Sequence, residues 1–425
     1  MKNRTFFIAL LAYGLVIAGL VTLQAPPIAM ALPLLIYLIG GLVWAPGEIQ
    51  VRAERSLSTS RIQIGQAIRV TLTVTNEGPL LEEALLEDVL PPGLEIIDGS
   101  SRRLVRLARG ASVTWTYTLR GKRGSYTLNR LQITAKDVLG LVTIRRAIDT
   151  HGQLFILPPV LRLRRVAIRP LQTRVYSGSI PARQGGSGVE FFDVREYQSG
   201  DSPHWINWRV TARDPLNMYS NQFEQERVAE VGIILDGRRR TNEFGQRSIF
   251  EHSILATAAL ADAFLNTGNR VGMLFYGKNV AVTFPGYGKI QEERLLHDLS
   301  RLEPGDSVMF SELVLPRKLF AGRAQLVLVS PLIAEDYPAL AALRMKGYPL
   351  LVVSPDPVAF ELQGTSGSRE DRLAARLVRI KRALLLKRLA GAGIQVVEWD
   401  VSVPFEHVAR QTLERHPALP RGAQR

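Results

Sequence analysis

Apolar and polar residues follow three patterns along the chain, and each pattern predicts a different kind of structure. Two uncharged apolar runs, 6–23 and 28–44, stand at the N-terminus. Between 48 and 160, apolar residues recur at every second position in several stretches, which is typical of half-buried β-strands. From 228 to 412, short apolar runs alternate with helical stretches, which predicts a mainly parallel, doubly wound α/β sheet.

The two N-terminal runs predict a transmembrane helical hairpin within residues 1–47. Each run forms a helix of roughly 26 Å, close to the roughly 30 Å of a bilayer core, and Trp44 stands at the expected interface. Lys2 and Arg4 precede the hairpin and more arginines follow it, so the positive-inside rule places both ends and the bulk of the chain in the cytoplasm of a membrane-bound protein. A cleaved signal peptide is the alternative, because Ala29-Met30-Ala31 resembles a cleavage tripeptide.

Residues 48–160 predict an all-β, immunoglobulin-like sandwich. The stretches 68–75 and 112–119 alternate cleanly and are rich in β-branched and aromatic residues. Turn signals such as Asn-Glu-Gly-Pro at 76–79 separate the strands. Several short strands at this spacing are typical of a sandwich. Catalytic residue types form no constellation here, so a spacer or interaction module is the simplest interpretation.

Composition and charge narrow the classes of function. The chain has 425 residues, of which 46% are hydrophobic and 22% charged, and this is ordinary globular composition. It contains no cysteine, which excludes disulfides, cysteine-based zinc sites and cysteine catalysis. Its net charge of +14 is spread over several arginine clusters without a zinc-finger or RNA-recognition pattern. Membrane lipid is therefore a better expected partner for the basic surface than a specific nucleic acid.

Familiar catalytic motifs are absent or incomplete. The stretch 272–279 nearly spells a phosphate-binding loop, but its middle residues form an apolar strand and Asn279 replaces the magnesium-binding hydroxyl. The six histidines form no His-Glu-x-x-His zinc motif. Asp201, Ser202 and His204 contain the residue types of a catalytic triad, but sequence neighbours rarely have triad geometry. We expect no catalytic residue, no metal and no cofactor.

One segment carries a long and specific pattern. It reads GVEFFDVREYQSGD at 188–201, WINWR at 205–209, TAR at 211–213 and NQFEQE at 221–226. This pattern resembles the signature of the domain-of-unknown-function 58 (DUF58) family, which is bacterial and archaeal. His204 and Asn207 depart from that signature, since Arg and Asp are usual there, so any ion pair between the two positions is replaced by neutral groups.

The signature, placed within 161–227, supplies the candidate site residues. Its charges are interleaved with aromatic residues, which suits either a loop held together by salt bridges or a protein contact surface. The candidates for this interaction or structural motif are Glu190, Arg195, Tyr197, Gly200, Asp201, Trp205, Asn207, Trp208, Arg213 and Glu224.

The resemblance also implies an architecture and a partner. It implies two N-terminal helices, a sandwich and a von Willebrand factor type A-like α/β domain over 228–412, with 413–425 left as a polar tail. Family members are often encoded beside MoxR-type AAA ATPases, which implies a membrane-anchored interaction scaffold that works with such an ATPase in protein assembly or maturation, and not an enzyme. The alternative is a membrane-associated hydrolase or nucleic-acid-binding protein that uses the basic surface and Asp201.

The α/β domain is expected to lack a metal-dependent adhesion site. In von Willebrand factor type A domains an Asp-x-Ser-x-Ser loop, a Thr and a distant Asp hold magnesium. Here Asp236 is retained, but Arg238 and Arg240 replace both serines. Asp306 and Ser307 stand near the expected threonine, and Ser330 stands where the distant Asp would lie. A guanidinium has no lone pair for a cation. We expect these arginines to turn toward water, an acidic partner or anionic lipid.

Overall fold

The chain folds into two compact units, Met1–Leu157 and Pro158–Arg425, in a computed structural model. The described residues are 2–43, 48–137, 139, 141–163, 166, 174–214, 216–245, 247–306, 315, 319–320, 324–365 and 368–413; within them only the backbone is described for 2–4, 42, 174–190, 192 and 223–228.

Two antiparallel apolar helices open the first unit, α1 (Lys2–Thr22) and α2 (Ala25–Val43). The chain reverses at Leu23, whose positive φ of 52° suits a tight turn. The prolines at 26 and 27 fall between the two apolar runs of the sequence, yet they lie in the first turn of α2, where a missing N–H has no helical partner to lose. The stretch Thr5–Thr22 is long and apolar enough to cross a membrane, whereas the apolar stretch of α2, Ala25–Gly41, is shorter.

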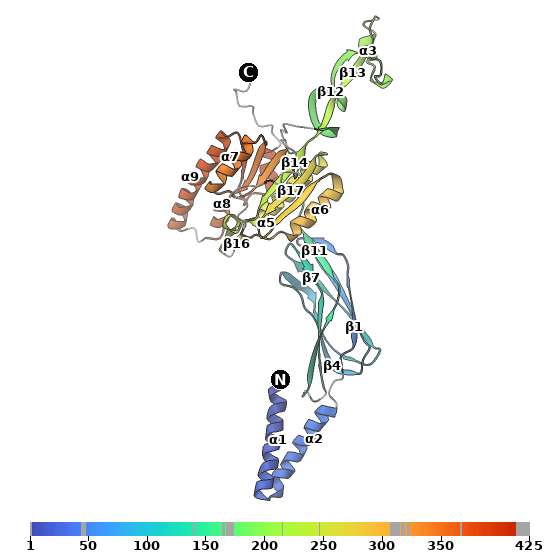
Figure 1. The fold of residues 1–425 in the computed structure, drawn as a ribbon, viewed down its shortest axis with the longest axis vertical. Helices are drawn as coiled ribbons and strands as arrows, with labels where there is room; N and C mark the ends of the chain where they lie inside the picture. Colours follow the sequence, from blue (N-terminus) through green and yellow to red (C-terminus); the bar gives the residue numbers. More distant parts are fainter. Residues whose placement is uncertain are drawn as a thin grey trace. The chain divides into compact units, whose positions relative to one another are not determined.

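The rest of the first unit is a β-sandwich, as the alternation predicts. One sheet has the strand order β1-β3-β7-β5, the other β10-β9-β4-β6, and a small third sheet β2-β11-β8 (Figure 1). The strands are β1 Val51–Leu57, β2 Arg61–Gln63, β3 Ile68–Asn76, β4 Leu81–Asp88, β5 Leu94–Gly99, β6 Arg102–Leu107, β7 Ser112–Gly121, β8 Gly124–Thr127, β9 Arg130–Lys136, β10 Thr143–Asp149 and β11 Gln153–Leu157.

One core fills the space between the two larger sheets. Every second residue of β3 is buried and meets the inward residues of β4, β7 and β9, because successive side chains of a strand point to opposite faces. A buried ion pair lies at the edge of this core. Arg55 on β1 donates to Asp88 at the end of β4, and the Tyr117 hydroxyl donates to the same carboxylate. Burial and the charge of Asp88 raise the pKa of Tyr117 above its usual range.

The second unit holds a six-stranded sheet with the order β18-β17-β14-β19-β20-β21 (Figure 1). All neighbouring strands are parallel except β17 and β18, which are antiparallel. The strands are β14 Glu230–Asp236, β17 Arg270–Tyr276, β18 Val280–Gly286, β19 Gln325–Val329, β20 Leu350–Pro355 and β21 Gln395–Trp399. The parallel α/β sheet expected from the alternating pattern is thus observed.

Helices cover both faces of this sheet. On one face, α5 (Phe250–Asn266), α6 (Gly288–Arg301) and α10 (Phe405–Thr412) contribute to one core, and on the other α7 (Tyr337–Met345) and α9 (Arg369–Gly391) contribute to a second. The short helices α4 (Arg239–Asn242) and α8 (Pro357–Leu362), and α10, were not predicted, because so few residues give a weak periodic signal. The near-phosphate-loop stretch lies largely in β17, as expected.

A separate two-stranded ribbon carries the signature segment. Strand β12 (Arg174–Glu196) pairs antiparallel with β13 (Tyr219–Val228), with several register shifts along its length. Between the two strands lie a 3₁₀ turn η1 (Pro203–Trp205) and the four-residue helix α3 (Trp208–Thr211).

Candidate functional site

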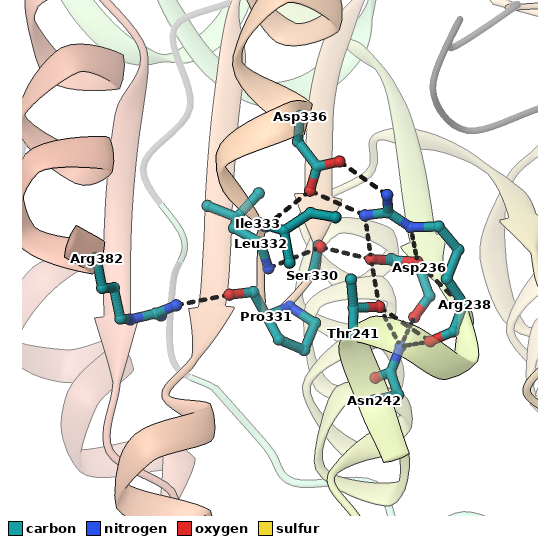
Figure 2. A network of polar contacts seen from close by, with 10 residues as sticks. All are labelled: Asp236, Arg238, Thr241, Asn242, Ser330, Pro331, Leu332, Ile333, Asp336 and Arg382. Atoms are coloured by element: carbon teal, nitrogen blue, oxygen red, sulfur yellow. Dashed lines mark hydrogen bonds and ion pairs between the residues drawn. The ribbon is translucent and has the colours of Figure 1, made fainter. Parts of the chain in front are cut away.

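The carboxyl ends of β14 and β19 meet at a buried polar network (Figure 2). Parallel sheets commonly bind ligands at this edge. Asp236 ends β14 and is fully buried, and its carboxylate accepts hydrogen bonds from Ser330 Oγ (2.7 Å) and Thr241 Oγ1 (3.0 Å). Asp236 and Ser330 are two of the positions at which the sequence suggests the remnant of a metal site, and the structure brings them together.

Arg238 lies inside this network and not in water. Its side chain is 2% exposed, and its guanidinium makes two-pronged contacts with two carboxylates at once. Nε and Nη2 donate to Asp236 at 2.9 and 2.8 Å, while Nη1 and Nη2 donate to Asp336 at 2.8 and 2.9 Å (Figure 2). Such forked, charge-assisted pairs are the strongest class of protein hydrogen bond. The expectation that Arg238 turns outward was therefore wrong, because two buried carboxylates solvate its charge better than partial exposure would.

The second carboxylate of this network was missed from the sequence. Asp336 follows β19 by several residues, in the turn η2 (Ala334–Asp336), and it also accepts from the Ile333 N–H at 3.0 Å. Ser330 stands where a distant Asp would lie, but its hydroxyl bonds to Asp236, and Asp336 supplies the acidic group. In the sequence, Asp336 could be noticed only as an acidic residue that follows a buried strand, and such residues are common in α/β proteins.

The network does not fit a divalent cation. A hard cation needs converging oxygen atoms, but the Arg238 guanidinium lies between the two carboxylates and takes up their lone pairs. Burial alone would lower the pKa of Arg238, yet the hydrogen bonds and charges of Asp236 and Asp336 raise it above its usual range. Within the described parts of the chain, no group of three or more His, Asp or Glu side chains has a metal-binding arrangement.

The neighbouring arginines behave differently from Arg238. Arg239 is 55% exposed and approaches Glu243 at 3.7 Å and Asp306 at 3.9 Å, and Arg240 is exposed, as expected for both. Ser307, which follows Asp306 near the position expected for the metal-binding threonine, lies outside the described residues.

A second buried arginine ties helix α9 to the same edge of the sheet. Arg382 donates from Nη1 to the Pro331 carbonyl at 2.6 Å, from Nη2 to Ser354 Oγ at 2.8 Å and from Nε to Glu398 at 2.7 Å (Figure 2 shows the first contact). These acceptors stand at or just beyond the ends of β19, β20 and β21. Both arginines therefore act as internal cations that hold the loops at this edge.

Two charged residues of the signature segment, Arg195 and Asp201, bond to each other. Arg195 Nη2 donates to Asp201 Oδ1 at 2.6 Å, and the Tyr197 hydroxyl donates to the Asp201 carbonyl at 3.0 Å. The N–H of Gln198 lowers the pKa of the Asp201 carboxyl, and Arg195 lowers it further against the opposing effect of burial. Gly200 has φ of 111°, which L side chains rarely adopt, so the turn requires glycine.

Asn207 and Trp205 shape the next turn. The Asn207 side chain accepts from the Val210 N–H, capping α3, and donates to Asn221 on β13 at 2.7 Å. Trp205 ends η1 and is half-buried. His204 is exposed and Asn207 points to Asn221, so the two departures from the family pattern serve separate surroundings.

Apolar side chains of the same segment face solvent. Trp208 is 66% exposed, Leu216 93% and Met218 44%, and we call these three the apolar tip cluster. They belong to one turn region, because the N–H of Asn207 donates to the Tyr219 carbonyl and that of Tyr197 to the Met218 carbonyl. Arg213 is exposed nearby, whereas Glu190 and Glu224 lie on β12 and β13 and their side chains are outside the described atoms. The candidates whose side chains are described thus include a bonded pair, Arg195 and Asp201, and exposed residues such as Trp208 and Arg213.

The family comparison agrees with this segment. Residues 193–363 match the model described as "Protein of unknown function DUF58", which spans the end of β12 through α8. This part of the chain belongs to the DUF58 family. Residues 55–145, which form most of the sandwich, match a model described as "BatD DUF11 like domain". Neither description names an enzymatic activity.

Other comparisons add little to this DUF58 chain. No curated protein matches it significantly. Among solved structures, a β-glucosidase from Erythrobacter marinus is 12% identical, with 24% of this chain and 15% of that chain covered and a TM-score of 0.15. A FixG-related protein from Vibrio parahaemolyticus is 15% identical, with 24% and 95% covered and a TM-score of 0.16. A CARDB domain from Pyrococcus furiosus, in complex with di-metal ions, is 12% identical, with 24% and 88% covered and a TM-score of 0.16.

These scores are too low to support a conclusion about fold or function, and this chain spans a small part of the first of those proteins. The apolar helix α1 and the BatD match together indicate a membrane-associated DUF58 protein.

Proposed function

We propose that this DUF58 protein is a membrane-anchored, non-enzymatic scaffold that binds a protein partner through the apolar tip cluster. The main support for the proposal is a contrast within the signature segment between bonded polar side chains and exposed apolar ones. Arg195 and Asp201 bond to each other, while Trp208 and its apolar neighbours are exposed. Exposed Trp beside apolar side chains is the usual composition of an energetic centre in a protein interface.

The α/β sheet is proposed to be of the von Willebrand factor type A kind. Support comes from the position of Asp236 at the end of β14, with Arg238 in a serine position of the metal loop and an acidic group after β19. In this chain the guanidinium takes the place of the cation. The fold would then present a rigid, metal-independent platform for protein binding.

The membrane anchor is proposed to be the hairpin of α1 and α2, with both ends in the cytoplasm. The antiparallel pairing of the two helices supports a double crossing, and basic residues flank the hairpin at both ends. Reporter fusions after Gly47 test this topology. Activity of a cytoplasmic reporter is expected, and activity of a periplasmic reporter would contradict the proposed orientation.

The proposed partner is a MoxR-type AAA ATPase, on the strength of the family resemblance alone. A hydrolase or nucleic-acid-binding role that uses Asp201 is less well supported, because its carboxylate is engaged by Arg195 and the Gln198 N–H. Catalysis would require Asp201 to leave both contacts.

Co-purification in detergent with the MoxR-type ATPase of the same genome tests the scaffold proposal. Trp208→Ala combined with Leu216→Ala should abolish capture and leave the melting temperature unchanged, because both side chains face solvent. Met345→Ala is a matched control, since this α7 side chain is 82% exposed and lies outside the signature. Equal capture by all three proteins would exclude the tip as the binding site, and absence of capture by the unmodified chain would exclude this ATPase as the partner.

A further inference from the structure

In the part of the chain that the structure describes, helix α9 packs against the sheet through one of its faces. Leu385 and Leu389 are buried in the second core of the α/β unit, Ala375 is buried nearer the N-terminus, and Arg382 makes the buried contacts described above. At 100° per residue these positions lie on a single side of the helix. Among the described residues, the opposite side of α9 makes none of these buried contacts.

That opposite side carries an apolar ridge. It consists of Leu373 (54% exposed), Leu377 (64%), Ile380 (52%) and Leu384 (55%), spaced by four, three and four residues. Helical geometry places all four within about 60° of the circumference, at about 170° from Arg382. A row of large aliphatic residues pointing away from the core of its own domain is the mark of an interaction surface.

Cations flank the ridge on both sides. Arg376 lies about 70° to one side of its centre and Lys381 about 70° to the other. The exposed basic residues of α9 are Arg369, Arg372, Arg376, Arg379, Lys381, Lys387 and Arg388. Its two acidic residues are confined to the first turn, where Asp371 is used in a capping box with Ser368. From Arg372 to the end of the helix the exposed charges are all positive.

We propose that α9 docks on an anionic bilayer surface, with the ridge inserted among the acyl chains and the flanking cations beside lipid phosphates. Long basic side chains can extend along the apolar surface and keep their charge in the headgroup layer. A bilayer presents negative charge on both sides of an inserted helix, which matches a ridge with cations on both flanks. The membrane association indicated by α1 would keep α9 at high local concentration near lipid.

The absence of cysteine from the chain allows a direct test with a single reporter. Leu377→Cys is labelled with an environment-sensitive fluorophore, and the full chain is reconstituted into vesicles of phosphatidylcholine alone or mixed equally with phosphatidylglycerol. The expected result is a blue shift and protection from aqueous iodide in the mixed vesicles only. A label on Met345→Cys, exposed on α7, is the control and should be quenched equally in both lipids.

A second experiment varies the charge of α9 and the salt concentration. Arg376→Glu with Lys381→Glu in the labelled chain should weaken docking by at least about fivefold for each cation removed, and high salt should weaken it as well. Both side chains are exposed, so the melting temperature should not change. Flotation of the vesicles reports anchoring through the N-terminal helices independently of the label.

The outcomes separate the competing explanations. A label at position 377 that stays accessible to iodide in both lipids, in a chain that floats with the vesicles, overturns the docking proposal and leaves the membrane anchor standing. Protection that is equal in both lipids, or that persists in detergent, also overturns it, because the ridge would then be covered by a protein surface such as a second copy of the chain.

Discussion

Replacing Arg238 by Met is the sharpest test of the internal-cation interpretation. The substitution keeps much of the aliphatic volume but removes a charge that makes four hydrogen bonds of 2.8–2.9 Å to Asp236 and Asp336. Both carboxylates are buried, at 0% and 1% exposure, and would face each other without a counter-ion. Removing one partner of a buried ion pair costs about 3–5 kcal/mol. In a domain of this size that loss lowers the melting temperature by roughly 6–20 °C.

The assay is thermal unfolding of the full chain in detergent, with Arg239→Met as the matched control. Arg239 is adjacent in sequence, but it is half-exposed and its acidic neighbours lie at 3.7 and 3.9 Å. A surface pair of this kind contributes less than about 1 kcal/mol. Combining Arg238→Met with Asp336→Asn should recover part of the loss, since one buried charge is then removed. Equal melting temperatures for the Arg238 and Arg239 variants would refute the reasoning.

A magnesium titration tests whether the site can bind a metal once the guanidinium is removed. In Arg238→Ser the carboxylates of Asp236 and Asp336 no longer bond to a guanidinium. Together with the hydroxyls of Thr241 and Ser330, which contact Asp236, they offer the oxygen ligands that magnesium prefers. Magnesium should raise the melting temperature of this variant and leave the unmodified chain unaffected. Stoichiometric binding to the unmodified chain, abolished by Asp236→Ala, would show that the predicted absence of a metal is wrong.

Three further predictions concern other parts of the chain. Asp88→Asn should destabilise the sandwich by about 3–5 kcal/mol, because Arg55 is left buried without its counter-charge, and calorimetry of the full chain measures this. Burial lowers the pKa of His252 below its ordinary value of 6.5, so the folded chain favours the neutral ring. The free energy of unfolding should therefore fall as the pH drops below 6.5 toward the pKa in the folded state. His252→Phe should flatten this dependence in melting curves from pH 7 to about 5. Asn207→Ala removes the cap of α3 and should cost about 1 kcal/mol, seen as faster hydrogen exchange at Val210, while unchanged exchange would argue against a structural role.

Local patterns determined most of the secondary structure. The alternation at β3 and β7 and the apolar runs at β14, β19 and β20 predicted strands correctly, because a residue's neighbours in sequence decide which face of a strand it occupies. The order of strands and helices also predicted a parallel sheet covered on both faces. The signature segment alone predicted membership of the DUF58 family, which the family match confirms, because so long a pattern rarely arises by chance.

The environments of individual charges were decided only by tertiary structure. Arg238 and Arg239 are indistinguishable by local pattern, yet one is buried and the other exposed, because Asp336, 98 residues away in the chain, lies within reach of only the first. Arg382 lies on the buried side of α9, and its charge is accommodated there by carbonyl, hydroxyl and carboxylate groups that the ends of three strands bring to it. A sequence determines which residues can be charged or apolar, but long-range packing determines which of them find a partner, and therefore which remain available for function.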